Sequence, residues 1–167
     1  MKDALVIHRW LLAQQAHHEI VRLPRPLTCA DDLPKVLGIP PLRCVSVGVF
    51  ATGREFIAVM TPAGTNPLPE AVGAAVGARR VRAASCAEIN EATEYSASFV
   101  GPLLLPEDVS LVMDQRLLDV LYSDEVVYCA TGESHTALGI RAFDLFTLTG
   151  AKPVELTPPR KGSRGRG

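Results

Sequence analysis

The sequence lacks several features that would assign it to a common class. None of its apolar runs approaches the ~18 residues that a membrane-crossing helix needs. Met1 is not followed by a long apolar region with a small-residue cleavage site, so no secretory signal is read. The glycine-rich motifs that bind nucleotide phosphates are also absent. We therefore expect a cytoplasmic protein outside the P-loop and dinucleotide-binding classes.

Cysteine and histidine are few and poorly spaced for metal binding. The four cysteines are widely separated and form no Cys-x-x-Cys pair. We expect reduced thiols, most of them buried. His8, His17 and His18 have no cysteine or carboxylate at ligand spacing. The sequence thus predicts neither a metal site nor a cofactor.

The composition is that of one folded domain with a basic tail. Hydrophobic residues make up 47% of the chain and charged residues 21%, and the formal net charge is -1. Such a balance gives no whole-chain attraction to nucleic acid or membrane. We expect a domain over residues 1–156, monomeric by preference, and a disordered tail over residues 157–167. The tail contains four cations: Arg160, Lys161, Arg164 and Arg166.

Hydrophobic periodicity and turn residues predict a mixture of helices and strands. Helices are expected over residues 3–16, 28–38, 67–77, 85–94 and 142–148, with a short one after residue 114. Strands are expected over residues 18–23, 44–51, 55–60, 79–83, 110–114, 125–130 and 136–140. The elements do not alternate strictly, so the predicted fold class is α/β of the α+β type. One mixed, mostly antiparallel sheet would be flanked by helices.

Local signals also predict two capping boxes and a core. Thr28-x-x-Asp31 and Ser85-x-x-Glu88 have the spacing of reciprocal caps at helix starts. The residues expected to be mostly buried are Leu5, Trp10, Val49, Ile57, Val59, Val81, Ile89, Val112, Val127, Leu138 and Phe143.

Seven short segments in a fixed order carry a family resemblance. They are Leu37–Pro41, Gly77–Arg82, Glu88–Tyr95, Leu105–Val109, Asp114–Leu118, Tyr128–Gly132 and Asp144–Ala151. From about residue 18 to residue 151, their order resembles the YbaK/EbsC family of aminoacyl-tRNA deacylases. The same domain occurs as the editing insertion of bacterial prolyl-tRNA synthetases.

The resemblance implies hydrolysis of the ester that joins a wrong amino acid to the terminal ribose of a tRNA, often a proline tRNA. Such domains act in trans and without metal, so the implied partners are aminoacyl-tRNA and possibly a prolyl-tRNA synthetase. Backbone amides are thought to polarise the ester carbonyl, while a ribose hydroxyl or a water assists proton transfer. Fixed donors of this kind supply several kcal/mol, roughly 3 per donor.

The chain departs from the family at its characteristic lysine. Counting from Gly38 places Ser46 at the lysine position, and a serine supplies no ammonium charge. Arg43 and Arg54 are near in sequence, but neither is well placed to replace that charge. The resemblance assigns catalytic roles to Ser46 and to Gly132, whose backbone follows a strand. As alternatives, Ser46 is an ordinary strand residue and Gly132 a plain turn residue.

The substrate-binding residues implied by the resemblance lie in two loops. They are Ser98, Phe99, Val100, Gly101, Pro102, Thr131 and His135. Ser98 stands where the family has glycine, and it either tightens the pocket or faces solvent while Gly101 supplies the flexibility. His135 could exchange a proton near neutral pH, although a turn histidine is more often simply solvated. We expect Ser46, Ser98, Gly101 and Gly132 to converge on one cleft.

Three functions follow from these features. The first is a free-standing deacylase that edits mischarged tRNA. The second is a YbaK-like module that lost turnover with the family lysine and only binds aminoacyl-tRNA or a synthetase. The third is a nucleic-acid-binding protein that acts through its basic tail.

Overall fold

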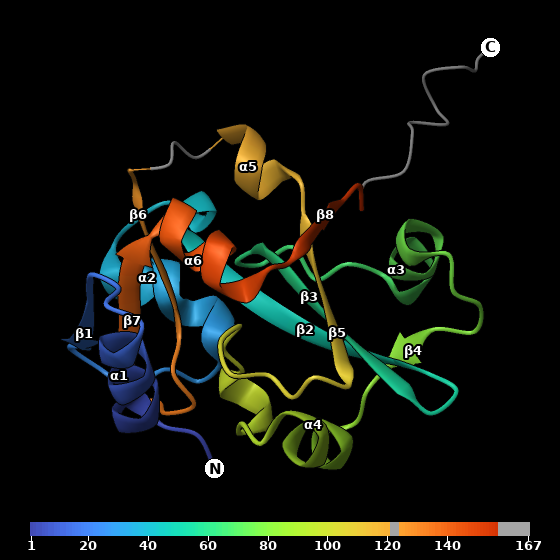
Figure 1. Cartoon of the computed structure of the whole chain (residues 1–167), viewed down its shortest axis with the longest axis horizontal. Coiled ribbons are helices and arrows are strands. Elements are labelled where there is room, and N and C mark those ends of the chain that lie inside the picture. Colours follow the sequence, from blue (N-terminus) through green and yellow to red (C-terminus); the bar gives the residue numbers. More distant parts are fainter. Residues whose placement is uncertain (121–123, 157–167) are drawn as a thin grey trace.

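The computed structural model describes residues 1–120 and 124–156 (Figure 1). They form an eight-stranded sheet in the order β1-β7-β6-β2-β3-β5-β8, and β4 pairs with β2 off this path. The strands are β1 (His18–Arg22), β2 (Cys44–Thr52), β3 (Glu55–Pro62), β4 (Arg82–Ala83), β5 (Val109–Asp114), β6 (Val126–Ala130), β7 (Thr136–Arg141) and β8 (Lys152–Val154).

The sheet is mixed and mostly antiparallel, which confirms the predicted fold class. Four pairings are antiparallel: β1 with β7, β2 with β3, β2 with β4, and β6 with β7. Three are parallel: β2 with β6, β3 with β5, and β5 with β8. The β2–β3 hairpin forms the long central ribbon in Figure 1. Its register sets Ser46 opposite Thr61, in the interior of the sheet.

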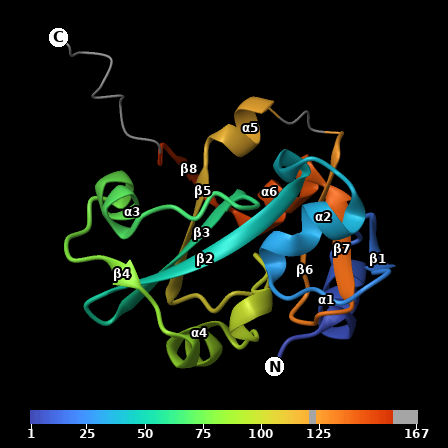
Figure 2. The same ribbon diagram turned by 180° about the vertical axis from the view of Figure 1, so that it is seen from behind.

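Six helices surround this sheet in the described part of the chain. They are α1 (Ala4–Ala13), α2 (Leu33–Leu37), α3 (Pro69–Val76), α4 (Cys86–Thr93), α5 (Arg116–Val120) and α6 (Ala142–Thr149). Three short 3-10 helices are η1 (Ala30–Asp32), η2 (Pro41–Arg43) and η3 (Ala97–Phe99). Figures 1 and 2 show α6 and α2 on opposite faces of the sheet. None of the described helices is long and apolar enough to cross a bilayer.

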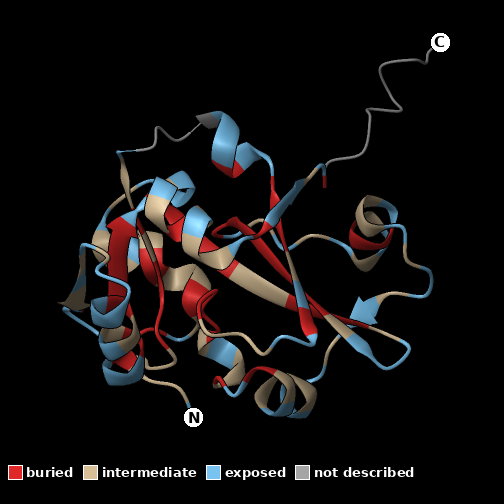
Figure 3. Cartoon of the chain, viewed as in Figure 1, coloured by how far each residue is buried: buried red, intermediate tan, exposed pale blue. Residues whose placement is uncertain are grey.

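Three hydrophobic clusters form the core, which Figure 3 shows as buried segments along the strands and the inner helix faces. The largest lies under α1 and α6 and includes Leu11, Tyr95 and Leu145. A second lies under α2, around Leu33. The third lies under α3, around Val72. Burial of these apolar side chains is what holds the helices against the sheet.

The predicted core is right for the strands and partly wrong for the helices. Six of the strand residues are buried: Val49, Ile57, Val59, Val112, Val127 and Leu138. Three are half-buried: Trp10, Val81 and Ile89. Two are wrong, because Leu5 is 52% exposed and Phe143 is 60% exposed.

The error in α1 has a simple cause. This helix is apolar on nearly every side, so its sequence does not define one inward face. The residues that it buries are Ala4, Ile7 and Leu11, which follow the spacing of a second apolar stripe. α6 likewise turns Ala142 and Leu145 inward.

The structure adds one strand to the predicted set and confirms the second predicted capping box. The added strand is β8, which contains Pro153; it is at the end of the strand order, where proline is tolerated. The capping box at Ser85 and Glu88 is confirmed by reciprocal hydrogen bonds of 3.2 and 2.9 Å. The predicted basic tail lies outside the described residues.

Candidate functional site

A small polar pocket opens at Ser46, between the β2–β3 hairpin and the short helices η1 and η3. Its volume is about 290 Å³. Residues with hydroxyl, amide and carboxylate groups line it from five separate segments. The lining residues are Cys29, Ala30, Asp31, Ser46, Val47, Gly48, Thr61, Asn66, Pro67, Ala97 and Ser98.

A hydrogen bond between Ser46 and Asp31 organises this pocket. The Ser46 hydroxyl donates to Oδ1 of Asp31 at 2.6 Å, and the backbone N–H of Gly64 donates to the same oxygen at 3.0 Å. Hydrogen bonds of a hydroxyl to an ionised carboxylate are short and stronger than neutral ones. Ser46 is only 8% exposed and Thr61, its cross-strand neighbour, only 3%. The serine is therefore held in one orientation by a carboxylate.

Asp31 is a pocket residue that is not among the predicted site residues. The predicted capping box of Thr28 and Asp31 is wrong. Asp32 performs the role, because its Oδ2 accepts from the backbone N–H of Thr28 at 2.8 Å and of Cys29 at 3.4 Å. These backbone donors lower the pKa of Asp32. The sequence does contain a signal for this contact, namely two adjacent acids at one helix start. Only one of them can cap the helix, so the other can contact a different segment.

The positive charge of the family lysine has no replacement in the pocket as described. Arg43 uses its Nε and Nη2 to donate to the backbone carbonyl of Val126, at 3.1 and 2.9 Å. Arg54 lies at the far turn of the β2–β3 hairpin and lines a different hollow. Neither arginine lines the Ser46 pocket.

The loop of residues 98–102 contributes one side chain to this pocket. Ser98 lines it and is also exposed to solvent. Phe99 packs against the cluster under α2, and Val100 is buried in the largest cluster. Pro102 lines a separate cleft of about 400 Å³. The loop thus lies between two hollows, and Ser98 alone of these residues lines the Ser46 pocket.

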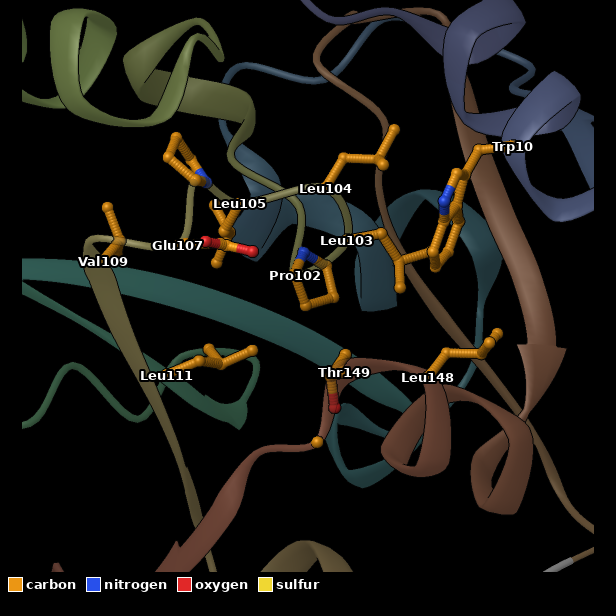
Figure 4. A pocket seen from close by; sticks show the side chains of 12 residues that line it. Trp10, Pro102, Leu103, Leu104, Leu105, Glu107, Val109, Leu111, Leu148 and Thr149 are labelled. Carbon is orange, nitrogen blue, oxygen red and sulfur yellow. The ribbon is translucent and has the colours of Figure 1, made fainter. Parts of the chain in front are cut away.

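The second cleft is lined mostly by residues with apolar side chains. Figure 4 shows Trp10 and Leu148 at one end, Val109 and Leu111 at the other, and Pro102 between them. Glu107 is the charged residue among those that line it. Ser46 and Asp31 do not line it, so it is distinct from the polar pocket.

Gly101 and Gly132 pack around the buried ring of Tyr95. The Tyr95 hydroxyl donates to the carbonyl of Leu103 at 2.6 Å, and burial raises the pKa of this phenol. A Cβ on Gly101 would come within 2.5 Å of the Ala130 carbonyl oxygen. Gly132 has φ +98, and a Cβ there would collide with the carbonyl of Lys2. Both glycines therefore permit close approach of the protein's own backbone.

Thr131 and His135 also form hydrogen bonds with other residues of the protein. Thr131 is fully buried, and its hydroxyl shares a hydrogen bond of 2.8 Å with that of Thr136. His135 is exposed, and its backbone carbonyl accepts from the N–H of Leu23 at 2.9 Å. Of the four residues expected to converge, the structure brings Ser46 and Ser98 to one pocket and leaves Gly101 and Gly132 around Tyr95.

The described residues contain no group of three or more His, Cys, Asp and Glu side chains that could hold a metal ion. The four cysteines are free thiols and differ in burial. Cys44 and Cys129 are buried, Cys29 is half-buried in the pocket wall, and Cys86 is exposed. The prediction that most thiols are buried therefore holds for two of the four.

Comparison with known proteins identifies the fold and the family. The family model described as "Aminoacyl-tRNA editing domain" matches residues 25–148, more than half of the chain. No curated protein matches the sequence.

Solved structures give the same fold at low identity. The hypothetical protein APE2540 is 23% identical, with a TM-score of 0.77, over 89% of this chain and 97% of that one. A candidate trans-editing enzyme for prolyl tRNA synthetase is 21% identical, with a TM-score of 0.76, over 91% and 94%. A protein from Marinobacter aquaeolei VT8 described in terms of signal transduction is 18% identical, with a TM-score of 0.63; the match covers 90% of this chain and 30% of that one.

Proposed function

Since this chain belongs to the aminoacyl-tRNA editing domain family, we propose that it hydrolyses the ester of mischarged aminoacyl-tRNA in trans. The observation that carries this proposal is the Ser46–Asp31 hydrogen bond of 2.6 Å in the wall of a small polar pocket. Ser46 stands where the resemblance puts the family lysine. Asp31 gives that position a proton acceptor, which a serine alone lacks.

The chemistry needs a water to add to the ester carbonyl and lose a proton. Because Ser46 donates its own hydrogen to Asp31, the serine oxygen is left to accept a hydrogen bond from the attacking water. The water's proton then passes to Ser46 as the serine proton passes to the Asp31 carboxylate. The ribose oxygen leaves as the tetrahedral intermediate collapses and takes up that proton. The products are the free amino acid and an intact tRNA end.

The size and polarity of the pocket favour a small aminoacyl group. Its 290 Å³ is at the lower end of the range for small-molecule sites. The hydroxyls of Thr61 and Ser98 and the amide of Asn66 give it polar walls. Alanyl, seryl and cysteinyl esters on a proline tRNA are the substrates we propose, with prolyl-tRNA synthetase as the partner whose errors are cleared. The likeness to a candidate trans-editing enzyme for that synthetase supports this choice.

A second function is a binding module without turnover. It is favoured by the same position, because Ser46 replaces a cation and no other cation lines the pocket as described. Such a module would bind the aminoacyl end of tRNA, or a synthetase, and leave the ester intact. Ser46→Lys would then restore hydrolysis if charge alone is missing.

Deacylation of alanyl-, seryl- and cysteinyl-tRNA(Pro), with and without prolyl-tRNA synthetase, separates the two functions. Loss of the ester above a buffer control is the expected result, and Ser46→Ala should slow it. Ser110→Ala, on the exposed face of β5, is the matched serine control and should leave the rate unchanged. Binding of aminoacyl-tRNA without any hydrolysis would instead support the binding module.

We also propose that the cations of residues 157–167 add a non-specific contact to tRNA phosphates. Removing the residues after Thr157 should lower tRNA affinity and reduce its dependence on salt. A salt dependence unchanged by the truncation would leave the tail without this role.

A further inference from the structure

We propose that Asp31 makes the Ser46 pocket a binding site for the α-ammonium group of the esterified amino acid. This inference rests on the proposed function and deepens it, because it assigns the part of the substrate that the pocket recognises. The first observation that supports it is the charge of the residues that line the pocket. Of the residues that line the pocket, Asp31 is the one with an ionisable carboxylate, and none of them is a lysine or an arginine.

In the part of the chain that the structure describes, Asp31 forms no ion pair with a lysine, arginine or histidine, although Lys35 acts on the adjacent Asp32. Arg116 reaches the adjoining turn, where its Nη2 lies 3.4 Å from the Thr65 hydroxyl. Its guanidinium is held by Asp114, to which Nε donates at 2.8 Å and Nη2 at 2.6 Å. The adjacent Asp32 is itself an acid, and its carboxylate accepts a hydrogen bond from the backbone N–H of Thr28. With the family lysine replaced by Ser46, the pocket has the sign that attracts a cation.

The hydrogen bonds of Asp31 leave capacity for such a ligand. Oδ1 accepts from the Ser46 hydroxyl and the Gly64 N–H. Oδ2 accepts no hydrogen bond from any residue that the structure describes. An ammonium group has three donors and no acceptor, so it matches a pocket with a free carboxylate oxygen and neighbouring hydroxyls. Thr61 and Ser98 supply those hydroxyls from the other walls.

The ester geometry favours the α-ammonium over a side-chain ammonium. The α-nitrogen is two bonds from the ester carbonyl carbon, so an Asp31 that binds it stays close to the reacting carbonyl. Ser46, bonded to the same carboxylate, is then held within reach of that carbonyl. A lysyl side chain would place its ammonium several bonds further away, in a pocket of only about 290 Å³.

The test uses a pair of non-hydrolysable ligands that differ in one group. They are 3′-deoxy-adenosine bearing a 3′-amide of L-alanine and the same compound with L-lactate, in which a hydroxyl replaces the ammonium. Affinities are measured by calorimetry for the wild type, Asp31→Asn and Ser46→Lys, with Asp32→Asn as the matched control. Thermal unfolding of each variant is recorded in parallel.

The wild type should bind the alanyl compound about 10- to 100-fold more tightly than the lactyl compound, the range expected for one charge-assisted hydrogen bond. Asp31→Asn should lose this preference and Asp32→Asn should keep it. Ser46→Lys should also lose it, because its ammonium pairs with Asp31 internally. This variant retains the carboxylate, so it decides the question even where Asp31→Asn is poorly folded.

Equal affinity of the wild type for the two compounds, or binding of neither, would overturn the inference. So would a preference that survives in Asp31→Asn. A third compound has the lysine side chain and a hydroxyl in place of the α-ammonium. If it bound as tightly as the alanyl compound, Asp31 would be assigned to side-chain cations instead. The proposed function fails separately: an alanyl preference without any ester hydrolysis retains the ammonium site and removes the deacylase.

Discussion

Two regions of the predicted site differ in what surrounds their key residues. At Ser46, polar groups are paired with one another and face open space. Around Tyr95, the space next to Gly101 and Gly132 is filled by carbonyls of Ala130 and Lys2. A glycine in the sequence therefore signals that something approaches closely, but here the approaching group is the chain itself. A functional site is better sought where polar side chains line an unfilled pocket.

Gly132→Ala tests the filled region and should have the largest effect on stability. The new methyl must adopt φ +98 and collide with the Lys2 carbonyl, and we expect a loss of about 2–5 kcal/mol in unfolding free energy. Gly53→Ala is the control, because Gly53 has φ +58 in open space and should lose only ~1 kcal/mol. Urea unfolding measures both. Equal losses would show that Gly132 is not packed against the N-terminal segment.

Tyr95→Phe should cost about 1–2 kcal/mol by the same measurement. It removes the 2.6 Å hydrogen bond to the Leu103 carbonyl and leaves that acceptor without the bond in the core. Tyr128→Phe is the control on β6, where the ring is half-buried, and should change stability by less than ~0.5 kcal/mol. If Tyr95→Phe were neutral, the region around Tyr95 would be hydrated and open to a ligand.

Much of the fold could be predicted because its signals are local. Ser85 and Glu88 lie three residues apart and cap α4 as their spacing predicts. The hairpin between β2 and β3 follows from two apolar strands joined by a short glycine turn. The inward face of α1 could not be predicted, since several apolar stripes compete and only packing against the sheet selects Ile7 and Leu11.

A site residue could be predicted where its position along one strand identifies it. Contacts between segments that are distant in the sequence could not be predicted. Ser46 follows from counting along the strand. Its contact with Asp31 spans fifteen residues of sequence and depends on which of two adjacent acids caps η1. The Tyr95 region depends on Lys2, ninety-two residues from Glu94, whose carbonyl accepts the Lys2 N–H at 2.8 Å. The spacing of residues in the sequence does not predict such contacts between distant segments.

Thiol labelling should sharpen the contrast by probing the pocket wall directly. Burial raises the pKa of Cys44 and of Cys129 to about 12, so both should resist an alkylating reagent at pH 8 until the protein unfolds. Cys86 should react first because it is exposed. Cys29 should react more slowly, and an alanyl-adenosine amide should protect it but not Cys86. Mass spectrometry of the labelled peptides would show a contradiction if the ligand left Cys29 labelling unchanged.

The smallest effect is expected at a surface ion pair remote from both regions. Arg82 donates to Glu88 at 2.8 Å, and this hydrogen bond, with the Ser85 N–H, lowers the pKa of Glu88 to about 2. A carboxyl with a depressed folded pKa stabilises the fold above its unfolded pKa, near 4.5. That contribution should fade as the pH falls from about 4.5 toward 2. Thermal unfolding of Glu88→Gln should lose this part of the pH dependence, and a curve parallel to the wild type would contradict the assignment.

The role of the Ser46 pocket is tested most directly by comparing two adjacent carboxylates. In single-turnover deacylation of alanyl-tRNA(Pro), Asp31→Asn should reduce the rate at least 10-fold, because it removes the proton acceptor bonded to Ser46. Asp32→Asn should keep the rate within about twofold and lose about 1 kcal/mol of stability, because it weakens only the cap of η1. Equal rates for the two variants, or a slower Asp32→Asn, would contradict the assignment of this pocket to the reaction.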